Sequence, residues 1–136
     1  MIALDTNVLV RYIVEDDPEQ APAAVALIER ALTHEEPIFI PQIVLCELVW
    51  VLSFAYRYKR EAIVGVLQHL RRGAQLVLEG ADEVKRATEA YAAGRGDFAD
   101  YLIAERAVAN GASIVATFDQ ALHADKRFAP PHRVAR

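Results

Sequence analysis

Short apolar runs that alternate with longer helical segments are the feature of this sequence that most constrains its fold. The runs cover residues 1–4, 38–40, 75–78 and 113–116, and none shows the polar alternation of a strand with one wet face. Apolar strands separated by helices are typical of a parallel sheet covered on both faces. We therefore predict an α/β fold, a three-layer α/β/α sandwich around a central parallel sheet of four to five strands, with a short edge strand near Val134 as the fifth.

The segments between these runs show the periodicity of helices. Residues 19–32 place apolar side chains at three- and four-residue spacing, which predicts an amphipathic helix. The segment from Pro41 to about Tyr56 is apolar nearly all round, which predicts a central, buried helix. Further helices are expected over residues 8–14, 59–72, 81–93 and 97–109.

The composition is that of a globular protein. The chain has 136 residues, 54% of them hydrophobic, with only 6 Gly and 6 Pro, which excludes a disordered chain and predicts a single domain over residues 1–136. A single cysteine, Cys46, excludes an internal disulfide framework and favours packing in a reducing compartment, so we expect a cytoplasmic protein. The longest apolar stretch, residues 43–54, is too short to cross a bilayer, and no membrane contact is expected.

Carboxylates follow the predicted strands at the points where a ligand site would form. Asp5 comes directly after the first run, Asp97 and Asp100 open the helix that leads to the fourth run, and Asp119 lies just beyond that run. In open parallel sheets the ligand site lies outside the carboxyl ends of the strands. Because carboxylate oxygens are the ligands that Mg²⁺ and Mn²⁺ take, this pattern predicts a divalent-cation site that acts on a phosphate-containing substrate.

Glu47 is the least expected acid, because apolar residues surround it from Ile43 to Leu52. An ionised carboxylate in such surroundings is costly unless a cation meets it, so we add Glu47 to the predicted metal ligands. Structural alternatives stay open for every member of the set. Asp5, Asp97 and Asp119 could be helix N-caps, Asp100 could be a first-turn acid favoured by the helix dipole, and Glu47 could be paired in the core.

The three segments that carry these acids resemble the PIN-domain family, and in particular its VapC-type toxins, over the whole chain. IALDTNVLVRYI is similar to the family's opening strand with its first acid at Asp5. PQIVLCELVWVL is similar to the helix that carries the second acid, here Glu47. GDFADYLIAERAVANGASIVATFD is similar to the third and fourth acidic segments and ends at Asp119. Asp97 and Asp100 both match the place of the third acid, and we favour Asp97 as a direct ligand with Asp100 as a second or water-mediated one.

The resemblance implies a PIN-like fold and a Mg²⁺- or Mn²⁺-dependent endoribonuclease. Such an enzyme cuts RNA with a metal-activated water and leaves a 5′-phosphate and a 3′-hydroxyl. The resemblance also implies a homodimer and a cognate antitoxin protein that fills the acidic groove. Thr6, Asn7 and Thr117 flank the acids and are candidates for orienting them, or for capping helices. The expected catalytic and metal-binding residues are Asp5, Glu47, Asp97, Asp100 and Asp119.

The formal charge of −4 argues against a general polyanion binder, although a metal rather than the net charge would meet the phosphate. Two basic groups could line an RNA groove, although a solvated charged face is the more common role of such residues. They are Arg57, Lys59, Arg60, Arg71 and Arg72 in one group and Lys126, Arg127 and Arg133 in the other. The rival interpretations are a Mg²⁺-dependent phosphatase-like or receiver-like domain and a non-catalytic PIN-like RNA-binding module. A phosphatase with an aspartate nucleophile would need a second Asp where Asn7 stands.

Overall fold

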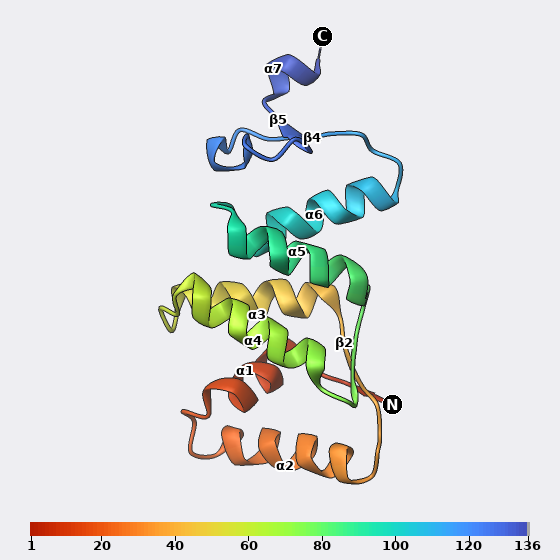
Figure 1. Cartoon of the computed structure of the whole chain (residues 1–136). Coiled ribbons are helices and arrows are strands. Elements are labelled where there is room, and N and C mark those ends of the chain that lie inside the picture. The colour runs from red at the N-terminus through yellow and green to blue at the C-terminus, as the bar shows by residue number, and fades with distance from the viewer. Residues whose placement is uncertain (136) are drawn as a thin grey trace. The chain divides into compact units, whose positions relative to one another are not determined.

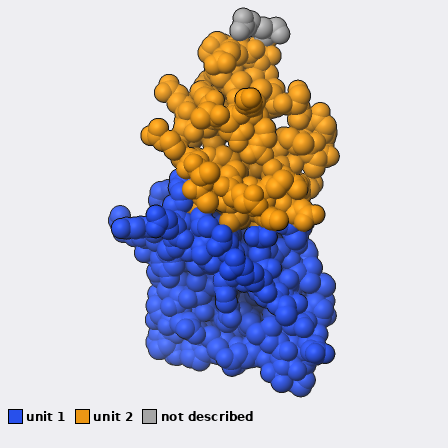
Figure 2. Space-filling model, in the orientation of Figure 1, with its two compact units in different colours: residues 1–81 blue, residues 82–136 orange. Residues whose placement is uncertain are grey.

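The computed structural model describes residues 1–135 of the chain. These residues form two compact units, unit 1 over residues 1–81 and unit 2 from residue 82 onward (Figure 2). The single domain expected from the sequence stays a prediction.

Unit 1 combines a parallel sheet with helices. Its elements are β1 (Ile2–Ala3), α1 (Thr6–Val14), α2 (Gln20–Thr33), β2 (Ile38–Ile40), α3 (Gln42–Phe54), α4 (Arg60–Arg72) and β3 (Leu76–Leu78) (Figure 1). The strand order is β1-β2-β3, all parallel, with Ile2 opposite Ile38 and Ile38 opposite Leu76. Because parallel strands end at the same edge, the chain leaves both β1 and β2 at one edge and enters α1 and α3 there.

The core of unit 1 follows the periodicity of the sequence. Ile38 and Ile40 of β2 are fully buried, as is Leu48 of α3. On α2, the buried residues Ala24, Ile28 and Ala31 repeat at three- and four-residue spacing, which confirms the amphipathic helix predicted there. Helix α1 packs against α2 and α3, so the first helix after β1 lies beside the helix that carries Glu47.

The prediction that α3 is buried all round is wrong. Ile43, Trp50 and Phe54 are 69%, 62% and 62% exposed, and Glu47, which lies on the same face, is exposed too. These positions follow one another at intervals of three and four residues, so they share one stripe of the helix. Leu45, Leu48 and Leu52 on another face fill the core. The apolar composition of this segment predicted a buried helix but did not show that one apolar stripe would be left in contact with solvent.

Unit 2 has two longer helices followed by short elements. They are α5 (Ala81–Ala93), which starts at the last residue of unit 1, α6 (Phe98–Ala109), β4 (Val115–Ala116), the 3₁₀ turn η1 (Gln120–Leu122), β5 (Phe128–Ala129) and α7 (Pro131–Val134) (Figure 1). Strands β4 and β5 are parallel, with Val115 opposite Phe128. The edge strand expected near Val134 is wrong, because Pro131 starts helix α7 there and the fifth strand lies earlier, at Phe128–Ala129.

The predicted α/β class with parallel strands is confirmed. Within residues 1–135 the strands pair as a three-stranded sheet and a two-stranded sheet. The strands expected over residues 38–40, 75–78 and 113–116 are present. The first has the expected bounds, the second is one residue shorter and the third is two residues shorter. No helix among the described residues is long and apolar enough to span a bilayer.

Candidate metal centre

Asp5 lies between β1 and α1 and caps that helix. Its Oδ1 accepts a hydrogen bond from the backbone N–H of Val8 at 3.1 Å, and its backbone is extended, as an N-cap requires. The capping alternative is therefore correct for this residue. The capped carboxylate can still bind another group, because an ionised carboxylate has a second oxygen and further lone pairs, and Asp5 is exposed.

Glu47 is held next to the start of α1. The Thr6 hydroxyl donates to Glu47 Oε1 at 2.9 Å, a bond between residues 41 positions apart. Since Asp5 directly precedes Thr6, unit 1 brings the Asp5 and Glu47 segments together as the sequence predicts. The prediction that Glu47 is surrounded by core is wrong, because its side chain lies on the exposed stripe of α3. Its hydrogen-bond partner is the neutral hydroxyl of Thr6.

In unit 2, Asp97 and Asp100 stand at the start of α6. The backbone N–H of Asp97 donates to Asp100 Oδ2 at 3.1 Å, which is one half of a capping box. Burial raises the pKa of Asp100 above its ordinary value, and the charges of Asp97 and Asp119 raise it further, while the Asp97 N–H acts in the opposite direction. Asp97 and Asp119 therefore lie close enough to Asp100 for their negative charges to act on it.

Asp119 caps η1 just after β4. Its Oδ1 accepts from the N–H of Ala121 at 2.9 Å, and its own N–H donates to the Thr117 hydroxyl at 3.0 Å. Thr117, one of the flanking residues named from the sequence, therefore orients the backbone of Asp119. The other two flanking residues differ from each other. The Thr6 hydroxyl contacts Glu47, while the exposed Asn7 side chain makes no hydrogen bond among the described residues.

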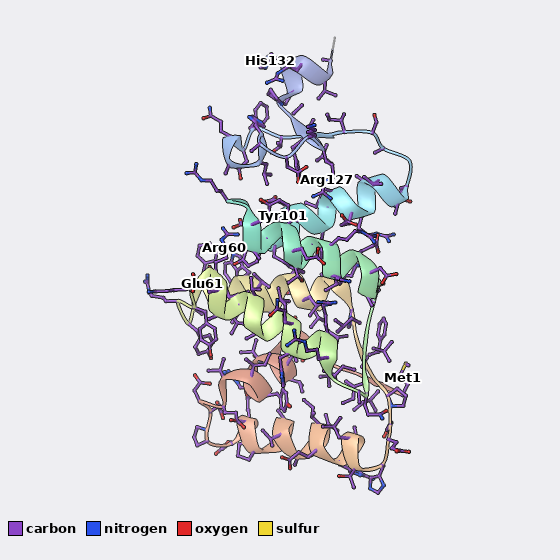
Figure 3. All side chains as sticks on the ribbon, viewed as in Figure 1. Met1, Arg60, Glu61, Tyr101, Arg127 and His132 are labelled. Atoms are coloured by element: carbon purple, nitrogen blue, oxygen red, sulfur yellow. The ribbon has the colours of Figure 1, made fainter. Side chains whose placement is uncertain are left out.

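Tyr101 holds the turn that presents Asp97, a role that the sequence analysis did not identify. Tyr101 is labelled in Figure 3. Its hydroxyl accepts from the N–H of Gly96 at 3.0 Å, and the ring, only 3% exposed, packs edge-on against Phe128. A side chain at Gly94 would meet the Tyr101 hydroxyl and the Ala90 carbonyl. The signal in the sequence was the pair of glycines at 94 and 96. A Cβ at Gly94 would meet Tyr101, and a Cβ at Gly96 would meet the Leu122 side chain.

Arg127, expected in a possible RNA groove, is engaged in an ion-pair network inside unit 2. Arg127 is labelled in Figure 3. Its Nη1 donates to Glu105 Oε2 at 2.7 Å and its Nη2 to Asp125 Oδ2 at 2.7 Å. Arg86 donates to the other oxygen of Glu105 at 2.6 Å, so this buried carboxylate is paired on both sides. These contacts favour a structural role for Arg127. The sequence missed this network, because charged residues 19 and 22 positions apart gave no local pattern.

The chemistry of the donors fits a hard divalent cation. Carboxylate oxygens are the ligands that such a cation takes. Burial is the main cause of the raised pKa of Asp100, and the charges of Asp97 and Asp119 add to it. Within residues 1–135, no group of three or more His, Cys, Asp and Glu side chains is already arranged as a metal-binding cluster. Cys46 is half-buried, and burial together with the charge of Glu47 raises the pKa of its thiol, which disfavours the thiolate.

Comparison with known proteins identifies the family of this chain. The family model described as PIN domain matches residues 2–127, a range that contains all five carboxylates. The VapC ribonuclease of Aquifex aeolicus (strain VF5) is 27% identical over 118 residues, covering 87% of this chain and 87% of the relative. The family match extends across both compact units. The chain belongs to the PIN domain family.

Proposed function

We propose that this protein is a metal-dependent endoribonuclease and the toxin of a toxin–antitoxin pair. The observation that carries the proposal is the PIN-domain match over residues 2–127. This range includes Asp5, Glu47 and the three acids of unit 2. The name of the similar Aquifex protein, VapC ribonuclease, supports RNA as the substrate. Asn7, at the position where an aspartate-nucleophile phosphatase would carry a second Asp, disfavours the phosphatase alternative.

The five carboxylates are the proposed ligands of Mg²⁺ or Mn²⁺. When bound, such an ion supplies a Lewis acid for the phosphate and a water of lowered pKa. Thr6 orients Glu47, the Ala121 N–H orients Asp119, and the Val8 N–H orients Asp5, so each of these carboxylates is held through one oxygen. In the proposed reaction a water oxygen attacks phosphorus and the bond to the 3′ oxygen breaks. The leaving oxygen takes up a proton, which gives a 5′-phosphate and a 3′-hydroxyl.

Protein partners are part of the proposal. A homodimer and a cognate antitoxin follow from the similarity to VapC-type toxins, and the exposed stripe of α3 supports contact with another protein. Trp50 and Phe54 lie there with ring centroids 5.3 Å apart, next to the exposed Ile43. Large apolar side chains clustered in solvent are typical of interaction sites.

Cleavage of total RNA tests the activity. Purified protein free of antitoxin is incubated with Mg²⁺ or Mn²⁺, beside Asp5→Asn from unit 1 and Asp119→Asn from unit 2. Asp82→Asn, an exposed first-turn acid of α5 outside the proposed set, is the matched control. We expect discrete fragments from wild type and the control, and losses in the two test variants greater than the about 10–100-fold typical of an outer-shell partner.

Two further measurements separate the alternatives. With EDTA the fragments should disappear, and Mn²⁺ should raise the melting temperature of wild type more than that of Asp119→Asn, because a ligand that binds only the native state stabilises it. Cleavage that persists in EDTA or in both variants would contradict the proposal. Release of phosphate from small phosphomonoesters with RNA left intact would indicate a phosphatase, and RNA binding without turnover would indicate a binding module.

A further inference from the structure

An open cavity of about 370 Å³ lies between α1 and α2, wholly within unit 1 and with Asp5 on its rim. Cavities of about 300–1,000 Å³ are the size in which proteins take small ligands. Val8, Ala23 and Leu27 supply an apolar wall, and Asn7, Arg11 and Gln20 supply polar groups. The position of this cavity at Asp5 places it beside the proposed reaction site.

Arg11 is fixed in this cavity by three side chains. Its Nε donates to Gln20 Oε1 at 2.7 Å, and its Nη1 donates to the Tyr56 hydroxyl at 3.1 Å and approaches Asp16 Oδ1 at 3.5 Å. Nη2 is the guanidinium nitrogen that makes no hydrogen bond among the described residues. A guanidinium held in one plane offers both a remaining donor and a flat face, at a smaller entropic cost than a mobile one.

Asn7 adds a donor and an acceptor on the same rim. Its side chain is exposed and makes no hydrogen bond among residues 1–135. A carboxamide can pair with an edge that carries both a carbonyl or ring nitrogen and an N–H. The cavity therefore combines an apolar wall, a flat cation and a neutral hydrogen-bonding group, while Asp5 contributes negative charge that would repel a phosphate lacking a counterion.

We propose that this cavity binds one unpaired nucleobase of the RNA next to the bond that is cut. Unpaired bases are recognised by contact of their flat faces with apolar, aromatic or guanidinium surfaces and by hydrogen bonds to their edges. Val8, Ala23 and Leu27 contact the face of the base, and Asn7 and Arg11 bind its edge. Gln20 acts as a positioning residue through its hydrogen bond to Arg11. This inference rests on the proposed ribonuclease function and adds the residues that select where the RNA is cut.

Nucleosides test the site without catalysis. The ¹⁵N-labelled full chain is titrated in EDTA with adenosine, cytidine, guanosine or uridine, with ribose as the control for the sugar. Nucleosides are chosen because they lack the phosphate that Asp5 would repel. We expect at least one nucleoside to shift the backbone amide resonances of Asn7, Val8 and Arg11, and ribose to leave them in place. Absence of shifts with all four nucleosides, or equal shifts with ribose, would overturn the proposal.

A matched pair of variants on α2 locates the site. Ala23→Phe fills the cavity, whereas Ala26→Phe puts the same ring on the same helix at an exposed position that does not line it. We expect Ala23→Phe to weaken nucleoside binding about tenfold or more, which corresponds to about 1.4 kcal/mol, and Ala26→Phe to leave it unchanged. Equal affinity of the two variants would contradict the assignment, and their dispersed amide spectra report whether each is folded.

The same pair separates this inference from the proposed activity. In the Mn²⁺-dependent RNA assay, Ala23→Phe should change the relative intensities of the fragments, while Ala26→Phe should reproduce the wild-type pattern. RNA cleavage without nucleoside binding would overturn the nucleobase site and leave the nuclease standing. Nucleoside binding without any RNA cleavage would overturn the nuclease and leave a nucleoside-binding cavity.

Discussion

The acids of unit 1 and those of unit 2 are held in different ways. Asp5 and Glu47 are joined through Thr6 by a hydrogen bond between helices far apart in sequence. Asp97, Asp100 and Asp119 are instead held by local bonds to backbone groups two or three residues away. Unit 2 also carries mutual repulsion, which contributes to the raised pKa of Asp100. The position of Glu47 therefore depends on tertiary packing, and that of the unit 2 acids on turn and cap geometry.

This comparison indicates which substitutions would displace the carboxylates in each half of the proposed site. A change that leaves both helices of unit 1 intact can still release Glu47, because one hydroxyl makes the connection. In unit 2 the acids stay near their places as long as the 94–96 turn and η1 keep their shape, and Tyr101 supports that turn by accepting from Gly96. Three predictions test the difference.

The largest effect is expected from Thr6→Val, which removes the hydroxyl that donates to Glu47 at 2.9 Å and keeps the shape of the side chain. Loss of an orienting partner typically costs about 10–100-fold in metal affinity or activity. We expect a decrease of that size in Mn²⁺-dependent RNA cleavage, with little change in the melting temperature of the metal-free protein. Thr6→Ser retains the hydroxyl and should keep most of the activity. An equal loss in both variants would show that the hydrogen bond is not what matters.

A smaller effect, on stability, is expected from Gly94→Ala in unit 2. The added Cβ would lie 2.8 Å from the Ala90 carbonyl oxygen and would also meet the Tyr101 hydroxyl. Overpacking of this kind destabilises by about 1–3 kcal/mol, which urea unfolding followed by circular dichroism would measure.

Gly65→Ala is the matched control for that substitution. Gly65 lies inside α4 of unit 1 and has no atom within 4 Å of an added Cβ. Because alanine is the better helix former, we expect Gly65→Ala to stabilise by about 0.5–1 kcal/mol. Absence of destabilisation by Gly94→Ala, or an effect no different from that of Gly65→Ala, would contradict the view that the 94–96 turn is the tightly packed support of unit 2.

The smallest effect is expected from Asp125→Asn and depends on pH. Hydrogen bonds from Arg127 hold the pKa of Asp125 below its ordinary value. A lowered native pKa means that the ionised carboxylate stabilises the fold, fully above the unfolded-state value and less as the pH falls through the native value. Asp125→Asn should therefore reduce the free energy of unfolding at pH 7 by at most about 1 kcal/mol, and by less below about pH 4.

Arg127→Met provides the control for the pH effect. In that background Asp125 has lost the hydrogen bonds at 2.7 and 3.1 Å from the guanidinium, so Asp125→Asn should produce a smaller pH-dependent difference. The four proteins compared are wild type, Asp125→Asn, Arg127→Met and the double variant. Their free energies of unfolding come from urea titrations at pH 7 and pH 3.5. A penalty that grows as the pH falls would have the wrong sign and would refute the assigned cause.

Local patterns predicted most of the fold but not the exposed face of α3. The α2 periodicity and the run at residues 38–40 correspond closely to the observed elements. The tail was misassigned, because Val134 favours a strand by its side chain while the preceding proline at 131 favours a helix start. The exposed face of α3 could not be predicted. A helix that is apolar on nearly every side has no polar stripe in its sequence to show which side faces solvent.

The sequence by itself determined the order of the acids and the family, and it offered Asp5, Asp97 and Asp119 as possible helix caps. These depend on residues within a few positions of one another, or on motifs that can be compared directly. The tertiary structure decided that Thr6 meets Glu47, that Arg11 is held at a cavity by Gln20 and Tyr56, and that Glu105 lies between two arginines. Such contacts join residues up to 45 positions apart, and they form only when packing brings separate helices and turns together.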